Sequence, residues 1–168
     1  MGKIFKIAGN FNRNRYSFSA RVVVENDNTF CGYCERVIID SYCSTDRYFV
    51  TGVIAEDEKH KGLAFYLLPN DPKDRPLMFV IPDIDEAGGC GGFEEFGTHK
   101  VKDESSWGEA NATYNELPYS NEDETYIKVV CFGNASKLDR NKKFIDSTSY
   151  CAQLLEEAQS KRRRLKGD

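Results

Sequence analysis

Apolar and polar residues alternate repeatedly along this chain, and a repeat of two predicts β-strands. In residues 16–25, "YSFSARVVVE", nearly every second side chain is apolar, so one face of the segment is apolar. The alternation resumes in residues 29–39, after the turn-forming residues at 26–28. We expect these two segments to pair as a hairpin.

Further strands are expected at residues 3–9, 47–56, 63–68 and 77–82, with weaker patterns at 93–101, 107–116 and 125–132. Most of the connections are short and rich in turn residues, such as "PNDPKDRP" at 69–76. Strands joined in this way pair antiparallel. The fold class is therefore predicted to be all-β, an antiparallel barrel or sandwich of about 8–9 strands within residues 1–135.

The spacing becomes helical near the end of the chain. Asp146 and Ser147 are suitable capping residues, and Tyr150, Leu154 and Ala158 lie on one side of a helix. We expect a C-terminal helix at 146–164 and a basic tail to residue 168, in a single domain of 168 residues. The apolar side of this helix either packs on the β-structure or binds a protein partner or a second copy.

Charge is distributed unevenly. The formal net charge is −4, but residues 161–168, "KRRRLKGD", carry +4, so residues 1–160 carry −8. An acidic body repels polyanions, so no duplex nucleic acid is expected as a partner. The basic tail is either a solvated helix end or a contact to RNA, an anionic surface or an acidic partner.

The N-terminal segment "MGKIFKIAGN" lacks the long apolar stretch of a signal peptide. No apolar run approaches the roughly 20 residues that a membrane-spanning helix needs. We therefore expect no membrane span and a cytoplasmic location.

Glycine and aromatic residues recur at corresponding places in successive predicted strands, between residues 28 and 115. They are Phe30, Gly32, Gly52, Phe93, Gly97, Trp107 and Gly108. This order resembles small lipocalin-like or avidin-like barrels, of the calycin type, although the early Gly-x-Trp motif of lipocalins is absent. The resemblance implies an up-and-down barrel whose interior can hold a ligand, without implying which ligand.

Six cysteines raise the question of metal or redox chemistry: Cys31, Cys34, Cys43, Cys90, Cys131 and Cys151. "CGYC" lies within a strand pattern, where residues three apart point to opposite faces, and a redox pair needs a helix N-terminus. Zinc would need two more ligands from Cys43, Cys90, His60 or His99. We instead expect reduced, buried thiols that serve as small apolar residues, with no metal and no cofactor.

Residues 83–94, "DIDEAGGCGGFE", place acidic residues and a glycine near calcium-loop spacing. Asp83, Asp85, Gly88 and Glu94 would occupy the ligand and turn positions. Ala87 stands where an oxygen ligand is needed, and the flanking patterns are strands, not helices. A flexible, acidic, glycine-rich connection is the favoured interpretation.

No catalytic motif is present, so the sequence leaves open whether the protein is an enzyme. The best candidates for acid–base chemistry are Glu95, Glu109, His99 and Arg21, provided that they meet inside a barrel.

Aromatic residues suggest a different use of the interior. Tyr16, Phe18, Tyr48, Phe65, Phe79 and Trp107 could line a cavity for a small apolar or aromatic ligand, or could simply fill the core. We rank a non-enzymatic binding barrel first, a protein-interaction or assembly module second, and an enzyme third.

Overall fold

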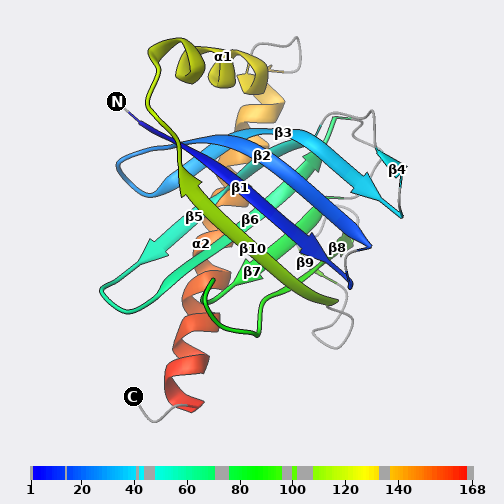
Figure 1. Ribbon diagram of the computed structural model, residues 1–168, viewed down its shortest axis with the longest axis vertical. Helices are drawn as coiled ribbons and strands as arrows, with labels where there is room; N and C mark the ends of the chain where they lie inside the picture. The colour runs from blue at the N-terminus through cyan, green and yellow to red at the C-terminus, as the bar shows by residue number, and fades with distance from the viewer. Residues whose placement is uncertain are drawn as a thin grey trace.

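The computed structural model describes residues 2–13, 15–40, 42–43, 48–70, 76–95, 100–101, 108–132 and 137–165, without the side chains of 94–95, 100–101, 132 and 137–146. An antiparallel β-barrel dominates it, and the strands follow one another around the wall (Figure 1). The wall strands are β1 (Lys3–Phe11), β2 (Tyr16–Val24), β3 (Thr29–Ile39), β5 (Tyr48–Glu56), β6 (Lys61–Pro69), β7 (Leu77–Ile81), β8 (Cys90–Glu95) and β10 (Gly108–Glu116). Two short strands, β4 (Tyr42–Cys43) and β9 (Lys100–Val101), pair with the ends of β3 and β8.

Strand β10 closes the barrel by pairing with β1 on one side and β8 on the other. Its pairing with β1 runs the length of the strand, from Glu116 opposite Phe5 to Ala110 opposite Phe11. Its register with β8 covers only Gly108 opposite Gly91 and the neighbouring pair. The predicted antiparallel all-β fold is confirmed, in its barrel form.

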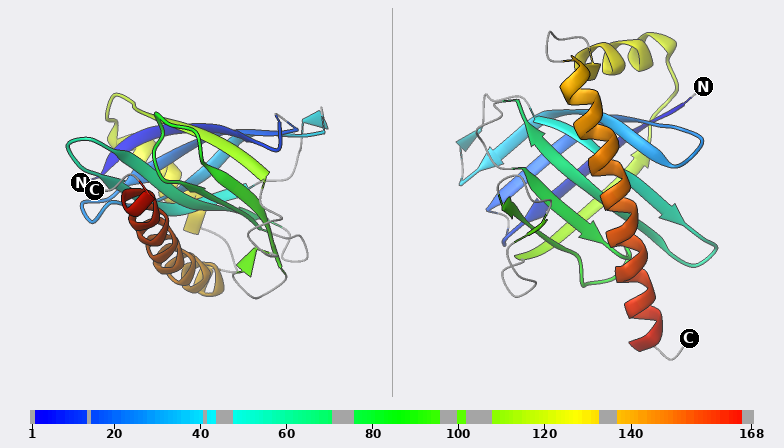
Figure 2. Two further views of the ribbon diagram at one scale, coloured as in Figure 1. Left: turned by 90° about the horizontal axis from the view of Figure 1, so that it is seen from below. Right: turned by 180° about the vertical axis from the view of Figure 1, so that it is seen from behind.

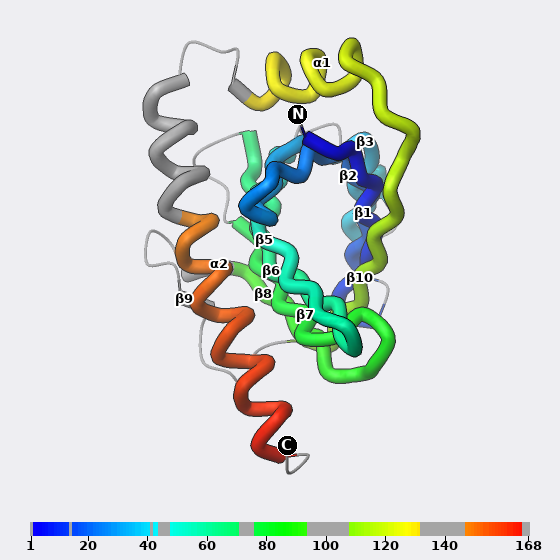
Figure 3. The backbone as a smooth tube through the Cα atoms, turned by 90° about the vertical axis from the view of Figure 1, so that its left-hand side faces the viewer, coloured from blue at the N-terminus to red at the C-terminus, as the bar shows by residue number. Residues whose placement is uncertain are grey.

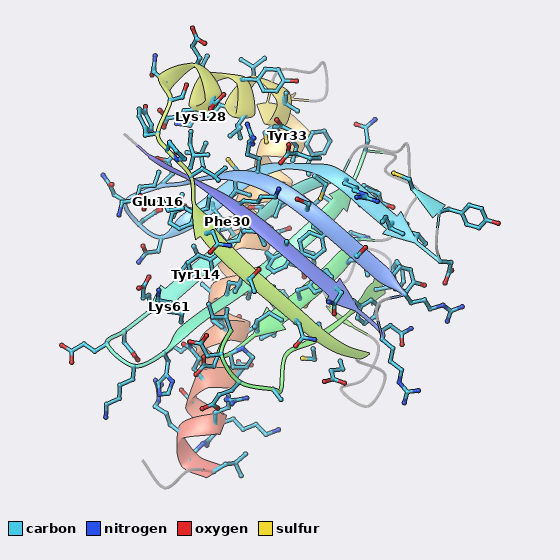
Figure 4. All side chains as sticks on the ribbon, viewed as in Figure 1. Phe30, Tyr33, Lys61, Tyr114, Glu116 and Lys128 are labelled. Carbon is cyan, nitrogen blue, oxygen red and sulfur yellow. The ribbon has the colours of Figure 1, made fainter. Side chains whose placement is uncertain are left out.

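Alternation along each strand decides which side chains point inside. In β2, Phe18 and Val22 are buried in the interior, whereas Arg21 lies on the outer face. In β3, Phe30 points into the barrel and Tyr33 points outward, toward the helix above it (Figure 4). The barrel therefore has an apolar interior, and a second apolar layer lies outside part of the wall.

The outer layer is covered by two helices, α1 (Asn121–Phe132) and α2 (Lys137–Leu165). Seen from behind, α2 crosses the outer face of β5, β6 and β7, and its C-terminal turns extend beyond the barrel (Figure 2). Phe49 and Tyr66 of the wall pack in one buried cluster with Ile127 of α1 and Leu155 of α2. Figure 3 shows α2 beside the wall that contains β5–β8 and α1 across the top of the barrel.

The strand predicted at residues 125–132 is wrong, because this segment belongs to α1. Its β-branched and aromatic residues resemble a strand pattern. The start of the helix is set by Ser120, whose Oγ accepts a hydrogen bond from the Asp123 amide at 3.3 Å. Acidic residues in the first turn also favour the positive end of the helix dipole. Two helices, not one, therefore follow the last strand of the barrel.

The C-terminal helix begins at Lys137, earlier than the predicted residue 146. Residues 137–143 are mostly polar, so no apolar stripe indicates this first part of the helix. From Ser147 onward the predicted stripe is confirmed, with Cys151 and Leu155 buried against the wall. Neither helix, over the described residues, combines the length and the apolar character needed to cross a membrane.

Candidate functional site

Five of the six aromatic residues predicted to bind a ligand lie in or against the core of the barrel. Phe18, Tyr48, Phe65 and Phe79 are buried there, and Tyr16 packs against the same cluster while half-buried. Trp107 lies outside the described residues. These five side chains therefore face the barrel interior, as the strand pattern predicts.

Within the barrel these rings pack on one another. Phe65 and Phe79 are stacked, with centroids 4.9 Å apart and planes 9° from parallel. Phe18 packs against both, at 5.5 Å from Phe65 and 5.3 Å from Phe79. At these centroid distances the three rings are in van der Waals contact. This part of the barrel interior is therefore filled by side chains.

A second group of rings lies toward one end of the barrel, where β1 ends and β2 begins. Tyr16 stacks on Phe11 at 5.3 Å and meets the edge of Phe93 at 5.6 Å. Tyr16 and Phe93 are both half-buried, unlike the fully buried rings deeper inside. This end of the interior therefore presents partly accessible aromatic surface.

The two acid–base candidates whose side chains the structure describes, Arg21 and Glu109, do not meet inside the barrel. Arg21 lies on the outer face of β2, with its Nε 3.6 Å from Oε1 of Glu35. Glu109 is exposed on β10, between Gly108 and the inward-facing Ala110. His99 and the side chain of Glu95 lie outside the described residues. Of the four, the two that can be placed lie on outer faces of different strands and form no common site.

The residues considered above as zinc ligands form no cluster in the described part of the chain. Cys31 and Cys34 point to opposite faces of β3, as the strand spacing predicts: Cys34 packs against the interior, and Cys31 faces α1. Cys43 is exposed, so the expectation of buried thiols is wrong for this residue. Across the part of the chain that the structure describes, no three metal-ligating side chains cluster together.

Asp83, the first residue of the calcium-like segment, instead fixes the turn after β7. Its carboxylate accepts hydrogen bonds from the Asp85 amide at 3.0 Å and interacts with Nδ1 of His60 at 2.8 Å. Burial raises the pKa of Asp83, but these hydrogen bonds outweigh burial and lower it below its ordinary value. Residues 82–89 form the connection from β7 to β8, and Cys90 already belongs to β8.

A groove of about 760 Å³ lies between α2 and the barrel wall. On the helix side it is lined by Leu154, Ala158 and Leu165, which follow one another at helical spacing. On the wall side it is lined by Val80 and Pro82 at the end of β7, and by the region where β8 meets β10. We call this hollow the α2 groove.

Glycine forms much of the floor of the α2 groove, at positions 88, 89 and 108. A Cβ atom on Gly89 would come within 2.4 Å of the Ala110 carbonyl oxygen, so a larger residue cannot be accommodated there. Gly88 has a φ of 117°, a conformation that other residues rarely adopt. Close packing at Gly89 and the positive φ of Gly88 therefore both require glycine in this part of the lining.

Basic side chains border the C-terminal end of the groove. Lys161 and Arg164 are exposed, whereas Arg162 pairs with Glu86 and donates to the Ala87 carbonyl at 2.9 Å. The two carboxylates in the lining are Glu109 and Glu157. The groove thus combines an apolar wall with two basic groups that face solvent.

The helix is held beside the groove by polar contacts to the turn after β7. Gln159 donates from Nε2 to the Pro82 carbonyl at 3.2 Å, next to the pair formed by His60 and Asp83. A cavity of only about 30 Å³ lies among these residues, which is room for about one water molecule. The Gln159 contact and the packing of Cys151 and Leu155 on the wall hold α2 beside the groove.

Sequence reasoning did not find the α2 groove, although it found some of its residues. The predicted apolar stripe includes Leu154 and Ala158 but does not extend to Leu165. The glycine-dense segment at residues 88–92 predicts only a connection between two strands. The apolar stripe and the glycine-dense segment come together only because of where α2 crosses the barrel. No local sequence pattern predicts that crossing point.

Comparison with known proteins adds no family to this picture. No protein-family model, no curated protein and no solved structure matches the chain. The closed up-and-down barrel agrees with the topology that the lipocalin-like and avidin-like resemblance implied, while no comparison connects the chain to those families.

Proposed function

We propose that this protein is a non-enzymatic binding module whose site is the α2 groove. The ligand class is a small molecule with an apolar body and an acidic group. The observation that carries the proposal is a hollow of about 760 Å³ in which an apolar helix face and a glycine floor meet exposed basic side chains.

The size and chemistry of the groove support this ligand class. Pockets for small molecules have volumes of roughly 300–1,000 Å³ and combine apolar walls with a few polar groups that fix orientation. Leu154, Ala158 and Leu165 would contact the apolar body, and Lys161 and Arg164 would bind the acidic group. A cytoplasmic location is part of the proposal and rests on the sequence features given above.

The test uses anilinonaphthalene sulfonate, an aromatic anion whose fluorescence rises on binding to apolar surface. Ala158→Trp fills the groove and is expected to weaken binding of the dye about tenfold or more, equivalent to ~1.4 kcal/mol. Ala152→Trp is the matched control, because Ala152 lies on the same helix, is exposed and does not line the α2 groove. Equal affinities of the two variants would contradict the proposal.

A second pair of variants tests the acidic group. Arg164→Glu is expected to weaken dye binding and to reduce its dependence on salt, whereas Arg163→Glu makes the same change in net charge outside the groove lining. If both variants bind the dye alike, the basic border of the groove has no role in recognition.

The half-buried rings of Tyr16 and Phe93, at the end of the barrel, favour a second candidate binding site for the same kind of function. There an aromatic ligand would stack on Tyr16 and on Phe11, and the deeper core would stay filled. Tyr16→Ala would then abolish dye binding while Ala158→Trp leaves it unchanged.

The alternative of a protein partner or second copy on the C-terminal helix is supported by Leu165, which is 79% exposed where α2 extends beyond the barrel. A sedimentation coefficient that rises with protein concentration in the wild type but not in Leu165→Glu would favour it.

A further inference from the structure

Exposed apolar side chains lie at two opposite ends of the molecule. Tyr126 and Val129 on α1 are 57% and 58% exposed, and Leu165 at the end of α2 is 79% exposed. Helix α1 crosses the top of the barrel, whereas the last turns of α2 extend beyond its bottom (Figure 1, Figure 3). Apolar side chains that gather in solvent mark contact surfaces, so both ends are candidate interfaces.

On α1 the exposed residues follow one another along one face of the helix. Glu122, Tyr126 and Val129 are spaced by four and three residues, and Thr125 lies beside them. We call these four residues the α1 face. The opposite face of the helix, which includes Ile127, packs on the barrel wall. The helix therefore has apolar side chains on two sides, one covered by the barrel and the other open to solvent.

The ring of Tyr126 is held in place by a neighbour from the barrel wall. Its centroid lies 5.9 Å from that of Tyr33 on β3, and the planes are 84° apart, so the two rings meet edge to face. Tyr33 is half-buried, whereas Tyr126 presents most of its surface to solvent. An aromatic ring fixed in this way is a suitable contact for a guanidinium group or an aliphatic side chain.

The two ends of the molecule carry opposite charge. Helix α1 contains three carboxylates and one lysine, and that lysine pairs with two carboxylates. Residues 161–165 of α2 contain four basic residues and no acidic one. Of these, Arg162 pairs with Glu86, whereas Arg163 and Arg164 are exposed beside Leu165. We call the last three residues the α2 end, whose charge is complementary to that of the α1 face.

The α2 end is directed away from the α1 face of its own chain. Helix α2 is continuous over 29 residues, which is a length of about 43 Å. Its C-terminal end points away from α1, on the far side of the barrel (Figure 3). A contact between the two complementary surfaces therefore requires two molecules.

We propose that the α2 end of one molecule docks on the α1 face of a second copy of this chain. Arg163 and Arg164 lie against Glu122 and the ring of Tyr126, and Leu165 packs beside them on the apolar part of the face. Each molecule uses two different surfaces at opposite ends, so the contact is heterologous and repeats into an open chain of molecules.

The contact is small, because it involves about one turn of each helix. It belongs to the weak, transient class of interfaces, with a Kd of roughly 0.1–1 mM. The proposal does not rest on ligand binding in the α2 groove, whose lining includes no residue of the α1 face.

Sedimentation velocity of the full chain, from about 20 µM to about 1 mM, tests the assembly across this range of Kd. The weight-average sedimentation coefficient is expected to rise throughout, without levelling off at the value of a dimer. Because opposite charges contribute to the contact, the rise should shrink in about 0.5 M salt. A coefficient that stays constant, or that levels off at a dimer, would overturn the proposal.

Tyr126→Lys blocks the α1 face by placing a positive charge opposite the basic α2 end. It is expected to weaken association about tenfold or more. Tyr42→Lys is the matched control, because Tyr42 is 79% exposed on β4 and the change in charge is the same. Val129→Lys repeats the test at a position outside the ring pair with Tyr33. Association of both α1 variants equal to that of the control would contradict the proposal.

A mixing experiment tests whether the two surfaces meet each other. Arg163→Gln combined with Leu165→Gln removes the α2 end, and this double variant alone is expected to stay monomeric, like Tyr126→Lys alone. A mixture of the two should form a 1:1 complex and nothing larger. One partner still has an intact α1 face, and the other still has an intact α2 end. Failure of the mixture to form this complex would refute the head-to-tail contact.

Vesicles that contain phosphatidylserine distinguish a membrane surface from a second copy as the partner of the α2 end. Vesicle binding that is lost in the double variant, together with no self-association of the wild type, would assign the α2 end to an anionic surface and overturn the proposal. Tyr126→Lys that no longer associates but binds anilinonaphthalene sulfonate like the wild type would support the proposal and show that assembly is separate from the α2 groove.

Discussion

Phe65 and Phe79 stack nearly parallel in the middle of the barrel, and this pair fixes the interior as a packed core at that depth. Both rings are almost completely buried and belong to neighbouring strands, β6 and β7, in direct register. Phe18 approaches the pair from the opposite wall.

Truncation of one ring should therefore be costly. Phe79→Ala is expected to lower the free energy of unfolding by about 3–5 kcal/mol, because it removes buried apolar surface and leaves a cavity. Urea denaturation at fixed pH measures this change. Phe79→Leu, which keeps most of the volume, is the control and should cost clearly less; equal losses would mean that the ring contacts are not important.

The pair formed by Asp83 and His60 predicts a dependence of stability on pH. Because the pKa of Asp83 is lower in the folded protein than in the unfolded chain, its ionised form stabilises the fold above the unfolded pKa. This stabilisation is lost as the pH falls through the lower, folded pKa. Asp83→Asn should reduce the free energy of unfolding by about 1–3 kcal/mol at neutral pH.

The difference between wild type and Asp83→Asn should shrink as the pH falls below about 4. Parallel urea titrations across this pH range measure it. Asp85→Asn is a suitable comparison, because Asp85 contacts the Asp83 carboxylate through its backbone amide and not through its side chain. A difference that stays constant with pH would show that the charge of Asp83 does not contribute.

Glu124 connects α1 to the beginning of β1. Its carboxylate accepts hydrogen bonds from the Gly2 amide at 3.0 Å and from the Tyr119 hydroxyl at 2.6 Å. Glu124→Ala is expected to increase hydrogen exchange of the amides in α1 and in residues 2–4, while exchange in β5 and β6 stays unchanged. The exposed neighbour Glu122→Ala is the control, and a uniform increase across the barrel would argue for general destabilisation instead.

Gly32 allows β2 and β3 to approach closely. A Cβ atom at this position would lie 2.0 Å from the Arg21 carbonyl oxygen and 2.7 Å from the Val22 Cα, so backbone would have to move. Gly32→Ala is therefore expected to lower the free energy of unfolding by more than ~2 kcal/mol. Thermal and urea unfolding measure the loss. Wild-type stability of this variant would contradict the close approach of the two strands.

The barrel could be predicted from sequence because alternation is a local signal. In β2, for example, Phe18 and Val22 fall on the same side as Ala20 whatever the rest of the chain does. The segment of α1 misled the same reasoning, since Ile127, Val129 and Val130 favour strands locally. Ile127 packs as part of a helix against wall residues that are distant in sequence, such as Val23. This tertiary packing stabilises the helix over the strand that the local pattern predicts.

The candidate site was predictable only in part, for a related reason. The inward direction of Phe65 and Phe79 follows from the strand pattern, but whether two inward rings line a cavity or fill it depends on their distance from the opposite wall. Likewise, the apolar stripe of α2 shows that the helix packs on something. It does not show that the helix crosses β5–β7 and passes beside the glycines of the turn before β8.

The uneven closure of the barrel has a consequence for how the chain folds during synthesis. Strand β1 pairs along its length with β10, which is the last of the barrel strands in the chain. The free edge of β1, which includes Phe5, is therefore covered only after residues up to Glu116 have been synthesised. Until then the earlier strands can form only an open sheet with two unpaired edges, which is the state most exposed to pairing with another chain. Contacts of such long sequence separation also slow folding. Closure of the barrel is therefore expected only after β10 has been synthesised, and α1 and α2, which follow β10 in the chain, can cover the outer wall only after that.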